Sequence, residues 1–371
     1  MAPRQRQMKL ADAGSDGTLP RQHGRKAHTV LVTGATGFLG RHVLSALRAL
    51  EPDTHICALV RNPAEWHAQA WTAELGDIDL IAGGVTGDDA WLRDPRLNGL
   101  GGIVHLAAVV RHSRRDTRDL YETNIHGLLR LVRLAGKHAC RIVFASTSGT
   151  VACFARRNQF ALEDAPYVDQ TVKNWPYYDS KIQAERQARL LAADLGVVAT
   201  AIRPPVLLGP GDHKFRSTGH VIKHLRQQLP FLIHGGMHFV DVRDAAMAMV
   251  RALRHPAARP VYHLGGTATS VEQFFGMLQD VSGVPAPVRV MPQRLAWLLA
   301  TAAAEAAARM PRPTHSPLPD PVVIEMAGHW WDIRSRYAAS ELGYVSRPPY
   351  QTLADTVDWL RANHPALGPA R

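Results

Sequence analysis

The sequence predicts an α/β fold, a doubly wound parallel sheet joined to a smaller, mainly helical C-terminal lobe. Short apolar runs alternate with segments of helical periodicity as far as residue 203, which is the pattern of parallel strands connected by helices. A glycine-rich turn lies between the first apolar run and the first helical segment. Beyond residue 203 prolines and glycines interrupt the chain repeatedly, so we expect a second structural unit to begin there.

The expected strands and helices follow one another in order along the chain. The first six strands span 29–33, 55–60, 78–82, 102–106, 141–146 and 197–203, and two short strands follow at 238–240 and 261–264. The expected helices begin near residue 38 and cover about 119–138, 177–195, 243–253 and 295–310. This order assigns 29–205 and about 237–265 to the sheet domain, and about 206–236 and 266–371 to the lobe.

The glycine-rich turn has the features of a dinucleotide-binding site. Residues 33–40 read Thr-Gly-Ala-Thr-Gly-Phe-Leu-Gly, directly after an apolar run and at the start of a helix. Gly34 permits the tight turn, Gly37 lets phosphates approach the backbone, and Gly40 lets the helix pack closely on the sheet. The bare N–H groups of the helix N-terminus favour a pyrophosphate. We predict cofactor contacts from Gly34, Thr36, Gly37, Phe38, Leu39 and Gly40.

A tyrosine and a lysine four residues apart open the helix expected at residue 177. Tyr177 and Lys181 share one face of that helix, because four residues make just over one turn. A nearby cation lowers the pKa of a tyrosine, which can then exchange a proton with a carbonyl or an alcohol. Tyr178 also lies close to the lysine in sequence, and a solvated helix face is the other interpretation of the pair.

Hydroxyl residues follow the strand expected at 141–146. The segment Phe144-Ala-Ser-Thr-Ser-Gly149 ends this strand, at a place where a hydroxyl can hydrogen-bond a substrate oxygen. A loop that caps a helix would have the same composition, so both interpretations stay open.

Together these segments resemble the extended short-chain dehydrogenase/reductase superfamily, also called the NAD-dependent epimerase/dehydratase family. The resemblance covers about residues 28–362. It looks closest to the branch of dihydroflavonol reductases, 3β-hydroxysteroid dehydrogenases and hopanoid-associated sugar epimerases. It rests on the glycine turn, His-Leu-Ala-Ala at 105–108, Asn-Ile-His-Gly at 124–127, the Tyr177–Lys181 spacing, Arg-Pro-Pro-Val-Leu-Leu-Gly-Pro-Gly-Asp at 203–212, Phe-Val-Asp-Val-Arg-Asp at 239–244 and Ser-Glu-Leu-Gly-Tyr at 340–344.

The resemblance implies a Rossmann-like NAD(P)-binding domain, a substrate lobe and a catalytic Ser/Thr, Tyr and Lys around the nicotinamide. Tyr177 is then the acid/base, and Lys181 lowers its pKa and holds the ribose. The hydroxyl falls on Thr147, with Ser148 as the alternative. The further cofactor contacts that the resemblance implies are Ala107 and Ala108 beside the ribose, and Pro204 to Val206 near the carboxamide.

The choice between NADP and NAD is expected to depend on Arg61. NAD-preferring members commonly carry an acidic residue after the second strand, whereas this chain reads Leu-Val-Arg-Asn at 59–62. An arginine there suits a 2′-phosphate, so we expect NADP, with NAD as the alternative and a solvated arginine as the other interpretation. The third strand departs from the family pattern, because Gly83-Gly84-Val85 lacks the usual acidic residue. The adenine contact is then expected from the Val85 backbone.

The composition favours a cytoplasmic enzyme without a metal. Three cysteines are too few for a disulfide scaffold, and the 19 histidines show no ligand spacing. The net charge of +11, part of it in a basic tail at 1–28 expected to be disordered, suits an anionic cofactor. The sequence lacks a run of basic residues interleaved with aromatics, so we do not expect it to bind nucleic acid. The helix expected at 295–310 is too short to span a bilayer and leaves contact with a membrane surface or a partner helix open. A homodimer is also open.

We therefore expect an NADP(H)-dependent oxidoreductase that interconverts a carbonyl and a secondary or primary alcohol of a small-molecule substrate. A sugar or nucleotide-sugar epimerase with tightly held NAD needs the same residues and is the first alternative. A dehydratase would need acidic residues after the threonine, where Ser148 and Gly149 stand. A non-catalytic NAD(P)-sensing regulator is the last alternative, although such proteins generally lack the Tyr/Lys pair.

Overall fold

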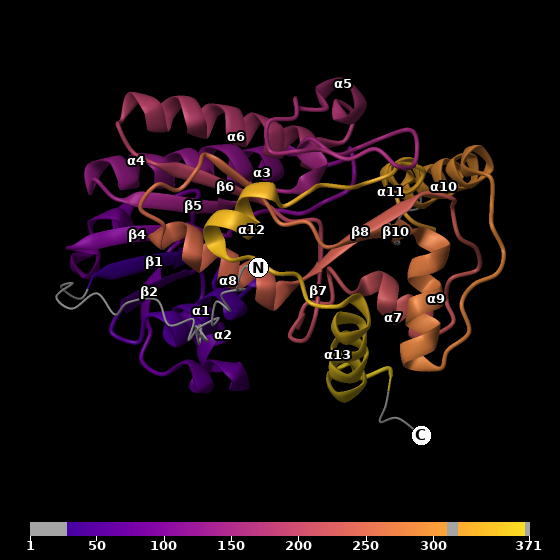
Figure 1. The fold of residues 1–371 in the computed structure, drawn as a ribbon, viewed down its shortest axis with the longest axis horizontal. Helices are drawn as coiled ribbons and strands as arrows, with labels where there is room; N and C mark the ends of the chain where they lie inside the picture. Colours follow the sequence, from indigo (N-terminus) through magenta and orange to yellow (C-terminus); the bar gives the residue numbers. More distant parts are fainter. Residues whose placement is uncertain (1–27, 310–317, 368–371) are drawn as a thin grey trace, which may run out of the picture.

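The computed structural model describes residues 28–309 and 318–367, and the tail expected at 1–28 lies almost wholly outside them. A seven-stranded sheet forms the centre of the larger part, with helices on both faces (Figure 1). Its order is β3-β2-β1-β4-β5-β6-β9, and every neighbouring pair is parallel. The strands are β1 Thr29–Thr33, β2 His55–Val60, β3 Asp79–Ala82, β4 Leu100–His105, β5 Arg141–Ala145, β6 Ala199–Arg203 and β9 Val261–His263.

This sheet confirms the predicted doubly wound fold. The chain moves outward from β1 through β2 to β3, then returns to place β4 on the other side of β1. Ligands bind at such a reversal of strand order, beyond the carboxyl ends of the strands. The expected strands at 29–33 and 55–60 match β1 and β2 residue for residue, and the other strands of this sheet match within three residues at each end.

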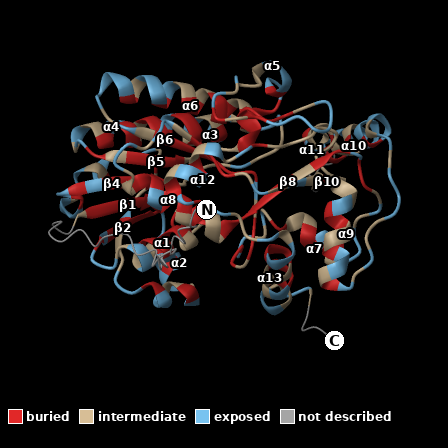
Figure 2. Cartoon of the chain, viewed as in Figure 1, coloured by how far each residue is buried: buried red, intermediate tan, exposed pale blue. Residues whose placement is uncertain are grey.

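Alternate residues of the buried strands explain why helices cover both faces. All five residues of β1 are buried. Val30 and Val32 pack in the core with α1 (Phe38–Leu50) and α8 (Val242–Arg254). Leu31 packs in the opposite core with α4 (Leu128–Lys137) and α6 (Pro176–Asp194). Figure 2 shows the buried residues concentrated in the sheet and on the inner faces of these helices.

The smaller part contains a three-stranded sheet as well as helices. Its order is β10-β8-β7, from Thr267–Ser270, Gly236–Asp241 and Val206–Leu208. The strand expected at 238–240 is β8, while β7 and β10 were not predicted. Phe239 of β8 packs with α7 (Gly219–Leu225), α9 (Val271–Ser282) and α13 (Pro349–Asn363) in a separate core. The lobe is therefore mixed, with helices outnumbering strands.

Several shorter or peripheral elements complete the described chain. Helix α10 (Gln293–Ala308) packs against α11 (Pro321–Ala327), and α12 (Arg336–Leu342) lies against β9 and α8. The remaining helices are α2 Pro63–His67, α3 Arg118–Tyr121, α5 Asp169–Val172, a π-helix at Glu122–Gly127 and 3₁₀ turns at Ala70–Leu75, Ala90–Arg93, Pro95–Leu97 and Ser148–Thr150. Within 28–309 and 318–367, none of the helices has the length and apolar character needed to cross a membrane.

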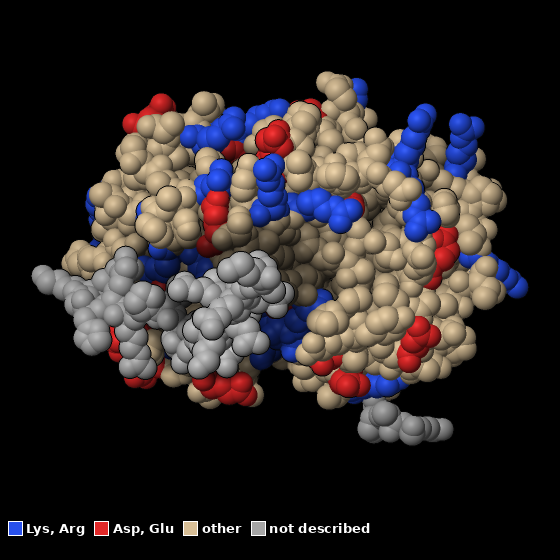
Figure 3. Space-filling model, in the orientation of Figure 1, with Lys and Arg blue, Asp and Glu red and all other residues tan. Residues whose placement is uncertain are grey.

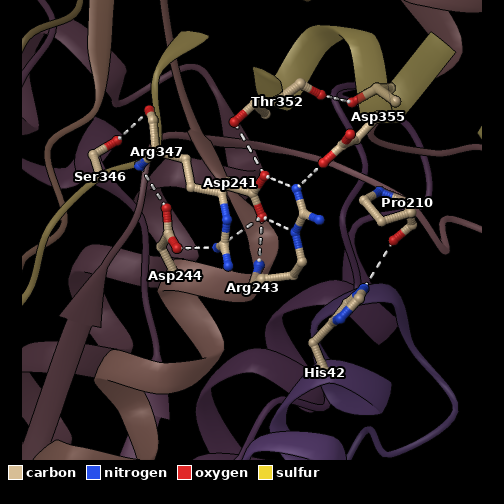
Figure 4. A network of polar contacts seen from close by, with 10 residues as sticks. His42, Pro210, Asp241, Arg243, Asp244, Ser346, Arg347, Thr352 and Asp355 are labelled. Carbon is tan, nitrogen blue, oxygen red and sulfur yellow. Dashed lines mark hydrogen bonds and ion pairs between the residues drawn. The ribbon is translucent and has the colours of Figure 1, made fainter. Parts of the chain in front are cut away.

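A charged network joins β8, α8 and α13 where β8 runs into α8 (Figure 4). Asp241 is fully buried and caps α8, accepting from the Arg243 backbone N–H at 2.9 Å. The Arg243 guanidinium donates to Asp241 at 2.7 Å and to Asp355 of α13 at 2.5 Å. Thr352 of α13 also donates to Asp241, at 3.0 Å. The expected motif at 239–244 therefore holds the smaller part against the larger one.

Candidate active site

The glycine turn after β1 forms a cradle that only glycines can line. Gly34 has a φ of +70°, and a Cβ there would lie 2.6 Å from the Ala107 backbone nitrogen. A Cβ on Gly40 would lie 2.2 Å from the Gly34 carbonyl oxygen. Gly37 is the N-cap of α1 and offers no side chain to its N–H groups. The arrangement suits the pyrophosphate of a dinucleotide, which would meet the turn at Thr36, Phe38 and Leu39.

Two buried polar residues align the ends of β1 and β4. Thr33 and His105 share a hydrogen bond of 2.7 Å between Oγ1 and Nδ1. Burial lowers the pKa of His105 to about 3, so this imidazole is neutral at physiological pH. The Ala107 N–H also donates to Thr33, at 3.4 Å. Ala107 and Ala108 stay half-buried beside the glycine turn, as a contact with the cofactor requires.

Arg41 is a further candidate cofactor contact, which the sequence analysis did not predict. It lies in the first turn of α1, where a cation is unfavourable to the helix dipole unless an anion is present. Its guanidinium stands 4.9 Å from the ring centroid of Trp71 and contacts His213. Burial lowers the pKa of Arg41. A basic residue directly after the last glycine of the turn was the available signal, and this residue could hold a phosphate.

The two tyrosines of α6 occupy different environments. Tyr178 is buried and stacks on Trp331, with 5.5 Å between the ring centroids. Its ring packs so closely on Gly149 that a Cβ at that position would lie 2.0 Å from it. Tyr177 is only half-buried and meets the edge of His112, from the loop after β4, at 5.2 Å. The geometry therefore favours Tyr177 over Tyr178 as the phenol that a substrate could reach.

Lys181 is buried and held at the end of β5. Its ammonium donates to the Ala145 carbonyl at the end of β5, at 2.8 Å, and burial lowers its pKa to about 8. Burial also raises the pKa of Tyr177 to about 12. Loss of solvent is the dominant effect on the pKa of both groups, and a lowering of the Tyr177 pKa by Lys181 stays a prediction.

The three hydroxyls after β5 are held in different ways. Ser146 is buried and donates to Glu185, and Ser148 is buried with its backbone N–H bonded to the Pro204 carbonyl at 2.9 Å. Thr147 is half-buried and accepts from the Gly149 N–H at 3.4 Å. Thr147 is thus the most accessible of the three. The bond to Pro204 brings the end of β6 to the same loop, and Val206 beyond it is exposed.

Two further groups support this constellation, and the sequence analysis assigned no role to them, although Asn124 and Arg203 lie in motifs of the resemblance. Asn124 lies in the π-helix, exchanges hydrogen bonds with the Val109 backbone at 2.8 and 3.0 Å, and donates to Ser180 at 3.0 Å. It thus joins the loop after β4 to the first turn of α6. A π-helical turn often marks a functional site. The signal available was a lone asparagine on an otherwise apolar helix face.

The second group is a buried ion pair behind the hydroxyl loop. Glu185 and Arg203 are both almost fully buried, and Arg203 Nε lies 3.1 Å from each Glu185 carboxylate oxygen. Tyr167 also donates to Glu185, at 3.0 Å. Glu185 lies one turn after Lys181, and this helical spacing was the available signal. The pair ties α6, β6 and the Ser146 hydroxyl together.

Arg61 lies at the end of β2, on the edge of the sheet that carries the glycine turn. It is exposed, and its Cγ lies 4.0 Å from the position of a Cβ on Gly84, at the end of β3. The nearest acidic residues are engaged elsewhere: Asp88 accepts from the Ala90 N–H and Asp89 pairs with Arg130. Figure 3 shows a hollow in the middle of one face of the molecule, with Lys and Arg side chains near its rim. These features suit an anionic cofactor.

The chain is similar in sequence and in fold to one protein family and its members. The model of the NAD dependent epimerase/dehydratase family matches residues 30–265. A putative dihydroflavonol 4-reductase of Synechocystis sp. is 29% identical over 345 residues, covering 91% of this chain and 96% of that protein. Sterol demethylase protein B of Methylococcus capsulatus is 26% identical over 337 residues, and the match covers 90% of this chain and 98% of that protein. The crystal structure of gox2253 aligns with a TM-score of 0.75 and 25% identity, covering 91% and 98%.

Proposed function

The chain belongs to the NAD dependent epimerase/dehydratase family, and from this premise we propose that it is an NADP(H)-dependent oxidoreductase interconverting a carbonyl and an alcohol. Membership makes it an NAD(P)-dependent enzyme of the extended short-chain dehydrogenase/reductase type. The proposal goes further in choosing reduction and NADP. The relative named as a putative dihydroflavonol 4-reductase supports the reductase assignment.

Tyr177 carries the proposed chemistry. When bound, the cofactor supplies the hydride for the carbonyl carbon. The Tyr177 hydroxyl donates the proton to the carbonyl oxygen, and its pKa of about 12 keeps that proton in place at neutral pH. The Thr147 hydroxyl donates to the same oxygen and orients it. Lys181, fixed to the Ala145 carbonyl, provides a cation near the ribose while the pH stays below about 8.

The single observation that favours NADP is Arg61 at the end of β2. An arginine can make a charge-assisted contact with a 2′-phosphate, whereas an acidic residue there would repel it. Gly84, which follows β3, carries no side chain beside Arg61 and supports this contact. The glycine turn, Ala107, Ala108, Pro204 and Val206 complete the proposed cofactor site.

Cofactor titration tests this proposal. We expect Arg61→Ala to weaken NADPH binding about ten- to a hundredfold, because a charge-assisted contact contributes about 1.5–3 kcal/mol. NADH binding should hardly change. Arg133→Ala, which removes an exposed arginine from α4, is the matched control and should bind both cofactors like wild type. Calorimetry or quenching of tryptophan fluorescence measures both affinities.

The epimerase alternative makes a different prediction in the same experiment. An epimerase would retain NAD through purification, and acid denaturation would release it for identification. If wild type prefers NADH and Arg61→Ala binds NADPH as wild type does, Arg61 is a solvated loop residue and the NADP-dependent reductase assignment fails.

The proposal also covers the division into domains, the cellular location, the oligomeric state and the substrate. We propose that 29–205 with about 237–265 binds the cofactor, and that about 206–236 with 266–371 forms the substrate side. A cytoplasmic location and a homodimer stay part of the proposal, to be tested by fractionation and by light scattering. The substrate is a small molecule, and the relative named sterol demethylase protein B supports an apolar one.

A further inference from the structure

Helix α10 presents its large apolar side chains outward. Leu295, Leu298 and Leu299 are exposed, with 58% of Leu298 accessible. Ala296 and Ala300 are buried against α11, each with 1% exposed. A surface helix ordinarily buries its leucines and exposes its small residues, so this pattern is the reverse of the usual one. The outward residues recur at spacings of three and four and form one continuous apolar face.

The chain leading into α10 extends the apolar character of this region. Val288 is 90% exposed and Val290 is 52% exposed, directly before the helix. Trp297 is exposed on the flank of the helix, where its indole N–H donates to Glu325 at 2.8 Å. An indole anchored at its polar end beside exposed leucines is typical of a helix lying at a membrane–water boundary.

Basic residues border the apolar face at both ends. Arg289 and Arg294 are exposed at the start of α10, and Arg309 is exposed at its end. The acidic residue of the helix, Glu305, lies 3.1 Å from Arg115 and 3.6 Å from Arg309, so its charge is compensated. Figure 3 shows Lys and Arg side chains projecting over α10 and α11. The face is therefore apolar with a positive border.

We propose that the outward face of α10, with Val288 and Val290, docks on an anionic lipid bilayer surface. Acidic headgroups complement the arginine border while the leucines enter the acyl boundary. A second copy of the chain fits less well, because a two-fold interface would place like-charged arginine borders against each other. The helix lies in the interface rather than across it, since α10 has 16 residues.

The inner side of α10 faces the substrate side of the molecule. A cavity of about 190 Å³ lies between the helix and the loop after β4, and its lining is largely polar and charged, with Ser113, Arg114, Arg115, Thr301, Glu305 and Asp320 among its residues. Ser113 directly follows His112, whose ring packs against Tyr177 at 5.2 Å. Docking through α10 would therefore place this cavity at the bilayer surface, within reach of a substrate that resides there. This last step rests on the proposed function, whereas the docking itself does not.

Vesicle co-sedimentation of the full chain tests the docking without any turnover. The probes are unilamellar vesicles of phosphatidylcholine alone and of an equal mixture of phosphatidylcholine and phosphatidylglycerol. We expect binding to the mixed vesicles, weakened by salt. Leu298→Gln should bind about tenfold more weakly, because the leucine loses its transfer into the apolar boundary. Arg294→Gln should bind about fivefold more weakly, because each basic residue near an anionic surface contributes about 1 kcal/mol to binding.

Matched variants on the opposite part of the molecule serve as controls. Leu190 of α6 is 64% exposed, close to the value for Leu298, and Arg133 of α4 is an exposed arginine. Leu190→Gln and Arg133→Gln should sediment with mixed vesicles as wild type does. The proposal is overturned if wild type ignores both vesicles, or if Leu298→Gln and Leu190→Gln bind equally. It is also overturned if light scattering shows a dimer that Leu298→Gln dissociates while vesicle binding stays absent. Cofactor titration and turnover are measured separately, so a failed reductase assignment leaves this result intact.

Discussion

The buried ion pair behind the hydroxyl loop should make Glu185→Gln one of the most damaging conservative substitutions in the chain. The Glu185 carboxylate accepts from Arg203 at 3.1 Å, from Tyr167 at 3.0 Å and from Ser146. The side chains of Glu185 and Arg203 are 2% and 3% exposed, so water cannot replace the lost charge. The amide of glutamine keeps the shape and leaves the arginine buried without its counter-ion.

Removing one partner of a buried pair costs about 3–5 kcal/mol of unfolding free energy. An exposed pair gives the matched comparison: Arg111 and Asp119 lie 2.8 Å apart with 35% and 56% of their side chains exposed. Asp119→Asn should therefore cost less than about 1 kcal/mol. Urea unfolding of both variants, followed by tryptophan fluorescence, measures the two losses under one condition.

The same variant should alter catalysis in a way that lost stability cannot imitate. The Glu185 charge raises the pKa of Lys181 against the larger lowering caused by burial. Glu185→Gln should therefore lower the Lys181 pKa below its value of about 8, and the alkaline limb of the kcat profile should move toward acid pH. The reasoning is refuted if Glu185→Gln unfolds at the same urea concentration as Asp119→Asn, or if its pH profile coincides with that of wild type.

Three further predictions concern the site and its buried histidines. Tyr177→Phe should fold and bind cofactor but lose about 10²–10⁴ in turnover, whereas Tyr178→Phe should retain turnover; the reverse result would show that the acid/base is Tyr178. Thr147→Ala should lower kcat more than Ser148→Ala, because Thr147 is the accessible hydroxyl, and a larger loss at Ser148 would reassign the role. Burial lowers the pKa of His105 to about 3, so this group contributes stability above its unfolded pKa of about 6.5 that is lost as pH falls toward 3. Urea midpoints should therefore decline from neutral to acid pH in wild type and less in His105→Asn, and parallel declines would contradict the assignment.

The main sheet and the glycine turn could be predicted because their signals are local. Val30, Leu31 and Val32 form an unbroken apolar run, which is what a strand buried on both faces requires. Gly34 has to be glycine, since its φ is +70° and the Ala107 backbone occupies the place of a side chain. The spacing of Tyr177 and Lys181 likewise follows from helical geometry alone.

The three-stranded sheet could not be predicted because its strands are defined by their partners. Strand β7 has three residues inside a run of prolines and glycines, and β10 reads Thr-Ala-Thr-Ser. The apolar run of β7 is too short to indicate a strand, β10 has no apolar run, and each becomes a strand by pairing with β8. β8 itself was recognisable from Phe239 and Val240, and the structure buries both.

The sequence by itself determined where the strands of the main sheet lie along the chain, the glycine turn and which residues share a helix face, since each follows from short-range geometry. Only the tertiary structure decided the chemical state of those residues. Burial raises the pKa of Tyr177 and lowers that of Lys181, which donates to the Ala145 carbonyl, and no spacing along the chain reports the loss of solvent. It also decided that the leucines of α10 face outward, because the direction of an apolar face depends on what the rest of the chain leaves uncovered.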